Sequence, residues 1–172
     1  MNLFADSSII SPLADIEESK CGSTIAVGEK STIDAFVKIK FTGGSGDIRI
    51  GNDSHINSGC VLYSGNGITM GDYVMVAANC TFAPVNHQYD RTDIPMRIQG
   101  FRPSKGGIVI ENDVWIAAGC VILDGAIIRQ GAIVAANSVV NGELEEYGIY
   151  AGAPAKLVSQ RVRRQPSVGD TA

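Results

Sequence analysis

Histidine is scarce in this sequence, and one of its two copies lies where a proton could be moved. His87 follows the short aliphatic run around Phe82 and falls within the segment 83–107, which has no regular hydrophobic pattern. A neutral imidazole can accept a proton near pH 7 without a large change in pKa, so His87 is the candidate general base. A zinc site would need three His ligands, and the second His is only His55, so we predict no metal.

Polar side chains lie close to His87 in the sequence and could hold a substrate or orient the imidazole. Asp90 or Asp93 could fix the tautomer of His87, and a backbone carbonyl could do so equally well. Other residues are suited to hydrogen bonding or covering a bound acceptor, and they are Asn79, Asn86, Tyr89, Arg97 and Gln99. The alternative for each of these residues is a solvated loop position.

The elements that would position these residues follow a period of six. Aliphatic residues recur without a slip at Ile110, Ile116, Ile122, Ile128, Val134 and Val140. A helix would show spacings of three and four and a free strand would alternate every two, so this pattern predicts short strands separated by turns. Hexapeptide periods are typical of parallel β-helices. We therefore expect an all-β solenoid.

The same period extends toward the N-terminus and divides the chain into coils of three hexads. We place the coil starts at Ile10, Val27, Ile50, Met70, Ile110 and Ile128. Ser11-Pro12 could instead cap a short helix, although hexads resume soon afterwards. Intervals longer than three hexads predict corner loops at 42–47, at 64–67 and, as a large insertion, at 83–107. Long loops in compact domains are often functional, so we expect the chemistry at 83–107.

Three cysteines keep the register of the hexads. Cys60, Cys80 and Cys120 each follow the second inward aliphatic residue of their coil by four positions, and Ser138 holds the same place in the next coil. We predict a column of small buried side chains with free thiols, not a disulfide or a metal site. No covalent intermediate on one of these thiols is then expected, because a nucleophilic Cys needs an adjacent base. Cys21 receives no role.

Composition bounds the class of protein. The chain has 172 residues, which suits one domain with a tail, and its net charge of -4 offers no basic surface for nucleic acid. No apolar run is long enough to cross a membrane, and the first residues lack the pattern of a signal peptide. We expect a cytoplasmic protein with no stable membrane insertion.

The end of the chain departs from the hexads in this interpretation. The segment after Val140 should leave the repeat, and 156–165 should form a short basic helix that stops before Pro166 and leads into a frayed tail. The predicted domains are therefore a β-helix at 1–155 and a helix with its tail at 156–172. Cations gather in the second part, and they are Lys156, Arg161, Arg163 and Arg164.

Several segments together resemble the hexapeptide-repeat acetyltransferases, in the branch of galactoside, maltose and virginiamycin-type enzymes. They are Val76-Ala-Ala-Asn-Cys-Thr-Phe-Ala-Pro-Val-Asn-His87, Asn112-Asp-Val-Trp-Ile-Ala-Ala-Gly119 and Ala151-Gly-Ala-Pro-Ala-Lys156. The loop from Asn86 to Gly100 is most similar to acetyltransferases of surface polysaccharides. The resemblance implies a left-handed β-helix, a homotrimer with active sites between subunits, acetyl-CoA as co-substrate and His87 as the base.

The resemblance also suggests roles for other residues. Asn57 matches a sugar-binding Asn of the relatives, although Gly59 departs from their Asn-x-Asn pattern. The donor would lie along a set of coil and C-terminal residues, namely Trp115, Ala117, Gly119, Ala135, Ala136, Lys156 and Arg161. The implied reaction is O-acetylation of a sugar hydroxyl. N-acetylation of a nucleotide-linked amino sugar is the alternative, and a non-catalytic scaffold is the interpretation from another class.

Overall fold

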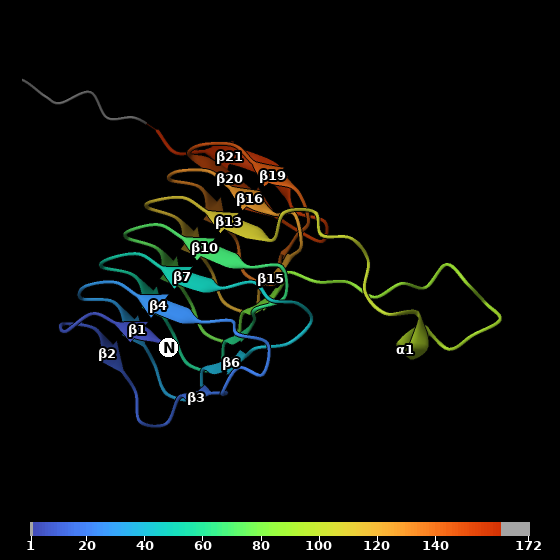
Figure 1. Cartoon of the computed structure of the whole chain (residues 1–172). Coiled ribbons are helices and arrows are strands. Elements are labelled where there is room, and N and C mark those ends of the chain that lie inside the picture. Colours follow the sequence, from blue (N-terminus) through green and yellow to red (C-terminus); the bar gives the residue numbers. More distant parts are fainter. Residues whose placement is uncertain (1, 163–172) are drawn as a thin grey trace, which may run out of the picture.

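The computed structural model of the protein describes residues 2–162, which form a parallel β-helix with three sheets running along it (Figure 1). Sheet A contains β1 (Leu3–Phe4), β4 (Ile25–Val27), β7 (Ile48–Ile50), β10 (Ile68–Met70), β13 (Ile108–Ile110), β16 (Ile127–Ile128) and β19 (Glu143–Leu144). Sheet B contains β2 (Ile9–Ile10), β5 (Thr32–Ile33), β8 (His55–Ile56), β11 (Met75–Val76), β14 (Trp115–Ile116), β17 (Ile133–Val134), β20 (Gly148–Ala151) and β21 (Lys156–Gln160). Sheet C contains β3 (Asp15–Ile16), β6 (Lys38–Lys40), β9 (Val61–Tyr63), β12 (Thr81–Ala83), β15 (Val121–Leu123) and β18 (Val139–Val140).

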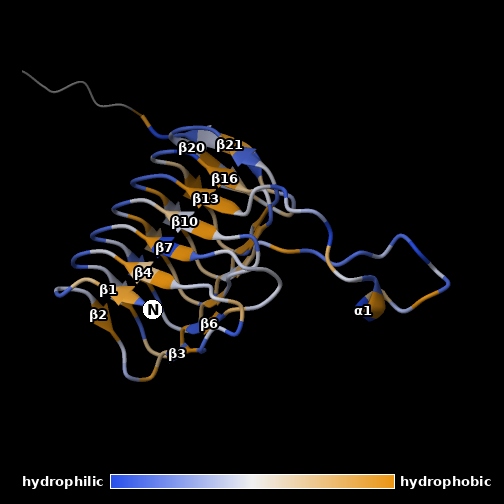
Figure 2. Ribbon diagram, viewed as in Figure 1, coloured by the Kyte–Doolittle hydropathy of each residue, from blue (hydrophilic) through white to orange (hydrophobic). Residues whose placement is uncertain are grey.

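The hexads place one aliphatic side chain of each strand in the core. On sheet A, Ile50, Met70 and Ile110 occupy the same register on neighbouring strands, and all three are buried. Colouring by hydropathy shows the strands as mainly hydrophobic and many of the turns between them as polar (Figure 2). Each coil therefore adds one layer of apolar contacts to a continuous core, which confirms the solenoid predicted from the period of six.

The first coil begins earlier than the sequence analysis placed it. Ile10 pairs with Ile33 on sheet B, and Phe4 pairs with Val27 on sheet A, so the coil starts at Phe4 and the predicted start at Ile10 is wrong. Ile10 and Ile16 both lie in strands, which excludes the short helix considered after Ser11. The interval between Ile10 and Val27 gave the wrong coil start because Ile10 lies on sheet B and Val27 lies on sheet A.

Every long interval in the repeat falls at one corner, between sheet C and sheet A. The loops at 42–47 and 64–67 and the insertion 83–107 all leave a strand of sheet C and return to a strand of sheet A. The insertion extends well away from the coils and carries the short helix α1 (Met96–Gln99) (Figure 1). We call the insertion the active-site loop.

The chain stays in the β-helix beyond Val140, contrary to the prediction. Leu144 on β19 pairs with Ile128, Tyr150 on β20 pairs with Val134, and both side chains are buried. The corner before β19 is too short to keep the six-residue period. The last coil could therefore not be recognised from that period in the sequence.

The predicted C-terminal helix is also wrong for the part that the structure describes. β21 (Lys156–Gln160) reverses direction and pairs antiparallel with β20, where it satisfies the open edge of sheet B. The pairing of β20 with β21 therefore crosses the boundary predicted after residue 155. The remainder of the predicted helix and tail, including Arg163 and Arg164, lies outside the described residues.

The cysteine column is present as predicted. Cys60, Cys80 and Cys120 are buried free thiols, and Ser138 is buried in the next coil. Each thiol donates to a backbone carbonyl of the following coil, for example from Cys60 Sγ to Ala77 O at 3.2 Å. Within residues 2–162, no helix has the length and apolarity to span a membrane, and no cluster of three metal-ligating side chains is found.

Candidate active site

His87 lies in the stem of the active-site loop, where the two ends of the loop run side by side. His87 and Phe101 form an antiparallel bridge, and Gln88 N donates to Gly100 O at 2.9 Å. On the other side of the bridge, Arg102 N donates to Asn86 O at 2.8 Å. These backbone contacts hold the two ends of the loop together at His87, although most of the loop projects into solvent.

An aromatic ring, and not a carboxylate, contacts the His87 imidazole. The centroids of the His87 and Phe101 rings are 4.6 Å apart, with an interplanar angle of 36°. The Asp90 carboxylate pairs instead with Arg102, and the Asp93 carboxylate pairs with Arg91. Both carboxylates that the sequence offered as orienting partners are therefore engaged elsewhere in the loop.

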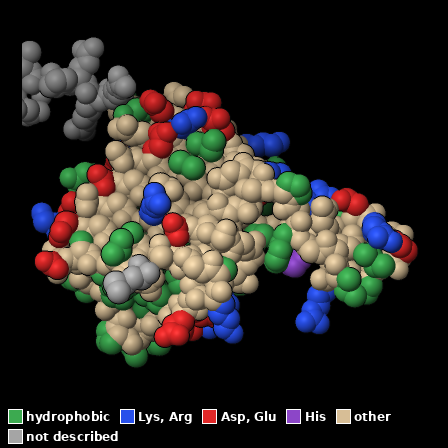
Figure 3. All heavy atoms as spheres, viewed as in Figure 1, with side chains coloured by type: hydrophobic (Ala, Val, Ile, Leu, Met, Phe, Trp, Pro, Cys, Tyr) green, Lys and Arg blue, Asp and Glu red, His purple; other side chains and the backbone are tan. Residues whose placement is uncertain are grey.

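A pocket of about 300 Å³ opens beside His87 on the side of the N-terminal coils. Its lining residues are Thr42, Gly43, Tyr63, Ala83, Val85, His87 and Phe101. Thr42 and Gly43 belong to the corner loop two coils away, and Tyr63 lies at the end of β9. We call this the His87 pocket. In the space-filling view the loop leaves a hollow beside the body of the β-helix (Figure 3).

A second pocket, of about 560 Å³, lies on the opposite side of the loop stem, toward the C-terminal coils. It includes two cations, Arg102 and Lys105, together with Tyr89, whose ring lies 4.0 Å below the Arg102 guanidinium carbon. Arg102 Nε is buried and has no hydrogen-bond partner among the described residues. We call this the cationic pocket.

Asp124 anchors the returning end of the loop. Its side chain is 9% exposed, and its carboxylate accepts hydrogen bonds from Lys105 N at 2.9 Å and from Gly107 N at 3.0 Å. Gly107 has φ +77°, and a Cβ there would lie 2.6 Å from Gly67 O, so the return requires a glycine. The loop is thus tied to the rigid coil at the cationic pocket, which Asp124 also lines.

The structure brings some of the predicted acceptor residues near His87. Asn86 and Tyr89 line the cationic pocket, and Asn86 Oδ1 accepts a hydrogen bond from His87 N at 3.0 Å. Gln99 binds the loop itself, donating from Nε2 to Arg91 O and Ile94 O. Arg97 is exposed on α1.

Asn57 and Asn79 lie at another corner of the same chain, between sheet B and sheet C. Asn57 Nδ2 donates to Val76 O at 2.8 Å, and the pocket beside Asn57 is lined by residues of β2, β5 and their corners, not by His87. Asn79 has φ +60°, a left-handed turn conformation that Asn tolerates better than most residues. Both side chains thus have local structural roles at this corner.

Most of the predicted donor residues share that corner or its neighbourhood. Trp115 points outward from β14 on sheet B and is 45% exposed, while Ala117, Gly119, Ala135 and Ala136 lie in the turns that lead into sheet C. The strands of sheet C separate these turns from the active-site loop within one chain. Within a single chain, the predicted donor residues around Trp115 therefore do not lie beside His87.

The two predicted C-terminal cations differ in availability. Lys156 is exposed on β21. Arg161 Nη1 is bound to Asp113 Oδ2 at 2.8 Å and to Gly131 O at 2.9 Å, and its guanidinium lies over the Tyr147 ring. Arg161 thus stabilises the last coil, and a phosphate would have to displace these contacts.

The two pockets also contain residues that were not predicted from the sequence, among them Thr42, Tyr63, Phe101, Arg102 and Lys105. A usable signal was present for the first two. The loop at 42–47, the loop at 64–67 and the insertion all occur between the third hexad of one coil and the first hexad of the next. Counting hexads in this way places them on one corner, and therefore next to each other in space.

Comparison with known proteins agrees with this architecture. The family model "Bacterial transferase hexapeptide (six repeats)" matches residues 107–142. A hexapeptide-repeat-containing acetyltransferase from Vibrio cholerae O1 biovar eltor, solved with acetyl coenzyme A, is 32% identical, with a TM-score of 0.69 over 81% of this chain and 70% of that one. The chain therefore belongs to the hexapeptide-repeat acetyltransferases, and this likeness agrees with the left-handed β-helix implied by the sequence.

Two curated relatives show what else the chain is similar to. A probable acetyltransferase of Mycobacterium tuberculosis is 29% identical over 86% of this chain, but the match spans only 46% of that relative. A putative lipopolysaccharide biosynthesis O-acetyl transferase of Escherichia coli is 28% identical over 81% of this chain and 70% of the relative. The chain thus spans about half the length of the first relative and more than two thirds of the second.

Proposed function

We propose that this protein is an acetyl-CoA-dependent O-acetyltransferase that acetylates a hydroxyl group of a sugar, in a cell-surface polysaccharide or its precursor. The observation that carries the proposal is the placement of His87. It stands at a fixed point of the loop stem and borders a pocket that could admit an acceptor hydroxyl. The chain is similar to a hexapeptide-repeat acetyltransferase solved with acetyl coenzyme A and to a putative O-acetyl transferase of lipopolysaccharide biosynthesis. Both similarities support this choice of reaction.

The chemistry requires only a base and a means of holding two substrates. Neutral His87 accepts the proton of the acceptor hydroxyl while the oxygen attacks the thioester carbonyl. The new C–O bond forms, the C–S bond breaks, and the coenzyme A thiolate takes the proton back from the imidazolium. Both substrates are present together, so their positioning supplies much of the rate acceleration.

The oxyanion of the tetrahedral intermediate needs a hydrogen-bond donor. A backbone N–H of the coil near Ala117 is one candidate for this donor. In the structure, Ala117 N donates to Val134 O at 2.9 Å and Gly119 N donates to Ala78 O at 3.0 Å, so neither is free. These two N–H groups are therefore already engaged within the coil.

The proposed assembly is a homotrimer with active sites between subunits. Within one chain, His87 and the predicted donor turn at Ala117 occupy different corners of the β-helix. A neighbouring copy that presents its Ala117 corner to the active-site loop would complete the cleft. Outward apolar side chains on sheet B, including Ile9, Met75 and Trp115, are exposed in the single chain and are suited to subunit contact.

Acetyl-CoA would lie in this cleft as co-substrate, with its phosphates near cations. Lys156 is free to serve, whereas Arg161 is already paired with Asp113. The chain's own loop adds Arg102 and Lys105 in the cationic pocket, the larger of the two pockets beside the stem. Phosphates favour such donors, so Lys105 extends the predicted donor set, whereas Arg102, like Arg161, is already paired with a carboxylate, that of Asp90.

An acceptor screen tests the reaction. Purified protein is incubated with acetyl-CoA and a panel of sugars, nucleotide sugars and polysaccharide precursors, and thiol release and product mass are followed. We expect release that depends on a sugar, with a mass gain of one acetyl group that is lost in mild alkali, as an ester is. An alkali-stable product on an amino sugar would support N-acetylation instead. Absence of acetyl transfer to every acceptor would contradict the proposal.

Mixed assemblies test the shared site. His87→Ala removes the base, and Ala117→Trp fills the proposed donor turn, so each variant alone should have little activity. If each site combines His87 of one subunit with the Ala117 corner of another, co-refolded mixtures should regain part of the wild-type rate. A mixture as inactive as either parent, in a sample shown to contain mixed trimers, would place the site within one subunit.

A further inference from the structure

The glycine-rich corner loops of two preceding coils stack directly under the active-site loop. Gly65 N donates to Thr42 O at 3.0 Å, and Asn66 N donates to Pro84 O at 3.0 Å. These bonds connect the loop at 42–47 to the loop at 64–67, and that loop to the first residues of the active-site loop. Three successive corners therefore form one continuous platform, and its top carries His87.

Glycines make this stacking possible. Gly43 has φ +82°, and a Cβ there would lie 2.8 Å from Val85 Cγ1. A Cβ on Gly65, where φ is +43°, would lie 2.9 Å from Pro84 O. Both distances are shorter than real Cβ contacts allow, so larger residues would push the platform away from the stem. The composition of the two corner loops, which sequence analysis explained only as turns, serves this close approach.

The two pockets beside the stem differ in charge. The His87 pocket is lined by two aromatic rings, small or aliphatic side chains, the Thr42 hydroxyl and the imidazole, and none of its lining residues is Lys, Arg, Asp or Glu. The cationic pocket across the stem contains two cations, Arg102 and Lys105, and one carboxylate, Asp124. A charged group entering the His87 pocket would lose hydration without gaining a charged partner.

We propose that the His87 pocket is the acceptor subsite, and that it selects a single uncharged sugar ring through Tyr63 and Thr42. This inference rests on the proposed function. The hydroxyl to be acetylated has to reach the His87 imidazole, and Tyr63 and Phe101 are the aromatic surfaces next to it. Aromatic rings pack against the C–H faces of neutral sugars, while the Tyr63 and Thr42 hydroxyls supply hydrogen bonds that orient the ring.

The size of the pocket limits what enters. Its volume of about 300 Å³ is at the lower end of small-molecule sites, which span roughly 300–1,000 Å³. One ring therefore fits, and any further sugar units extend into solvent. A uronic acid of the same size should be excluded by its carboxylate.

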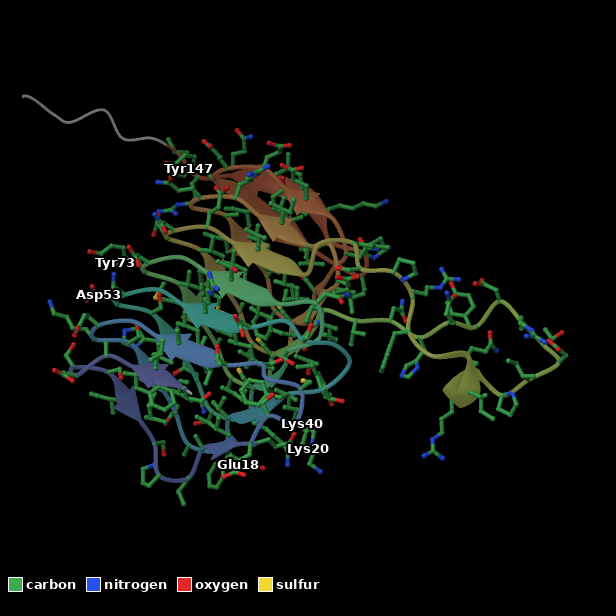
Figure 4. The ribbon with its side chains drawn as sticks, viewed as in Figure 1. Glu18, Lys20, Lys40, Asp53, Tyr73 and Tyr147 are labelled. Carbon is green, nitrogen blue, oxygen red and sulfur yellow. The ribbon has the colours of Figure 1, made fainter. Side chains whose placement is uncertain are left out.

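Substitutions at two tyrosines separate this inference from a general effect on the fold. Tyr63 is half-buried and lines the pocket, whereas Tyr73 is 61% exposed at a corner on the side of the β-helix away from the loop (Figure 4). We expect Tyr63→Ala to raise KM for the acceptor about tenfold while KM for acetyl-CoA stays unchanged. Tyr63→Phe should retain the ring packing, so its KM for the acceptor should rise less than that of Tyr63→Ala. Tyr73→Ala is the matched control and should leave both constants at the wild-type values.

A pair of acceptors gives a second test that needs no variant. A methyl hexopyranoside and the methyl glycoside of the matching hexuronic acid, with a free carboxylate, differ only at C6, and the wild-type enzyme should prefer the neutral ring by at least about tenfold in kcat/KM. Equal or better use of the hexuronate, or an acceptor KM in Tyr63→Ala equal to that in Tyr73→Ala, would overturn the subsite while leaving sugar acetylation intact. A wild-type enzyme that acetylates no sugar would remove the proposed function and the subsite together.

Discussion

The imidazole of His87 packs against the phenyl ring of Phe101, with 4.6 Å between the ring centroids and a backbone bridge joining the two residues. Among the described residues, the nearby carboxylates Asp90 and Asp93 pair with arginines instead. The orientation of the proposed base therefore depends on packing and on the backbone of the loop stem.

Phe101 should therefore act as a positioning residue for His87. Phe101→Ala removes the ring that limits imidazole rotation, so we expect kcat to fall about tenfold, with a smaller change in KM for acetyl-CoA. Phe101→Tyr keeps the ring and should restore most of the rate. Steady-state kinetics over a range of pH checks this, because loss of packing should also change the pH profile of kcat. Equal rates in the wild type and Phe101→Ala would exclude the role.

Asp124 should control the returning end of the active-site loop. Asp124→Ala leaves the amides of Lys105 and Gly107 without their acceptor, and we expect a loss of about 1–3 kcal/mol in the free energy of unfolding. Asp124→Asn retains one acceptor oxygen, so its free energy of unfolding should fall less than that of Asp124→Ala. Denaturant unfolding measures both variants. If Asp124→Ala were as stable as the wild type, the anchoring contact would have no energetic role.

The cysteines should divide into one reactive thiol and three protected ones. Cys21 is exposed, and hydrogen bonds from Ser23 and Ser19 lower its pKa, which favours the reactive thiolate. The adjacent Cys80 thiol and burial raise the pKa of Cys120, which favours the inert thiol. We expect Ellman's reagent to modify one thiol quickly in the native protein and all four after unfolding. Rapid modification in the native Cys21→Ser variant would contradict the buried column.

Stability should depend on pH through the carboxylate of Glu111. A hydrogen bond from Arg129 and one from Gln130 N lower the pKa of Glu111 below its usual value. A lowered pKa means that Glu111 stabilises the fold above the unfolded-state value of about 4.3 and loses this contribution as the pH falls through the folded-state value. Glu111→Gln should therefore be less stable than the wild type at pH 7 in thermal unfolding, and the difference should shrink as the pH is lowered through the folded-state pKa of Glu111. A difference that does not shrink with acid would exclude this cause.

The hexads revealed the solenoid because each inward aliphatic residue is required by the core. They missed the last coil, because the corner before Leu144 is shorter than a hexad and breaks the period. The segment from Lys156 to Gln160 forms a strand through pairing with the distant β20, and that edge is not visible in local sequence. Local propensity was therefore overruled by a tertiary contact.

Some residues of the candidate site could likewise be predicted from the sequence, and others could not. The imidazole was identifiable from its type and its position after the Phe82 hexad. The partners of His87 were not, because loop contacts such as Asp90 with Arg102 depend on how the two ends of the loop meet. Tyr63 and Thr42 were within reach, since counting hexads places their corner loops beneath the insertion. The donor residues lie on another corner, and whether a second subunit unites them with His87 stays a prediction.

The most direct test of the account is the acceptor-dependent rate of thiol release from acetyl-CoA in the wild type and in His87→Ala. Loss of a positioned general base typically costs a factor of about 10²–10⁴. We predict a fall of that size in kcat, in a variant whose unfolding midpoint and oligomeric state match those of the wild type. A His87→Ala enzyme that retains the wild-type kcat on a verified sugar acceptor would contradict the assignment of His87 as the base.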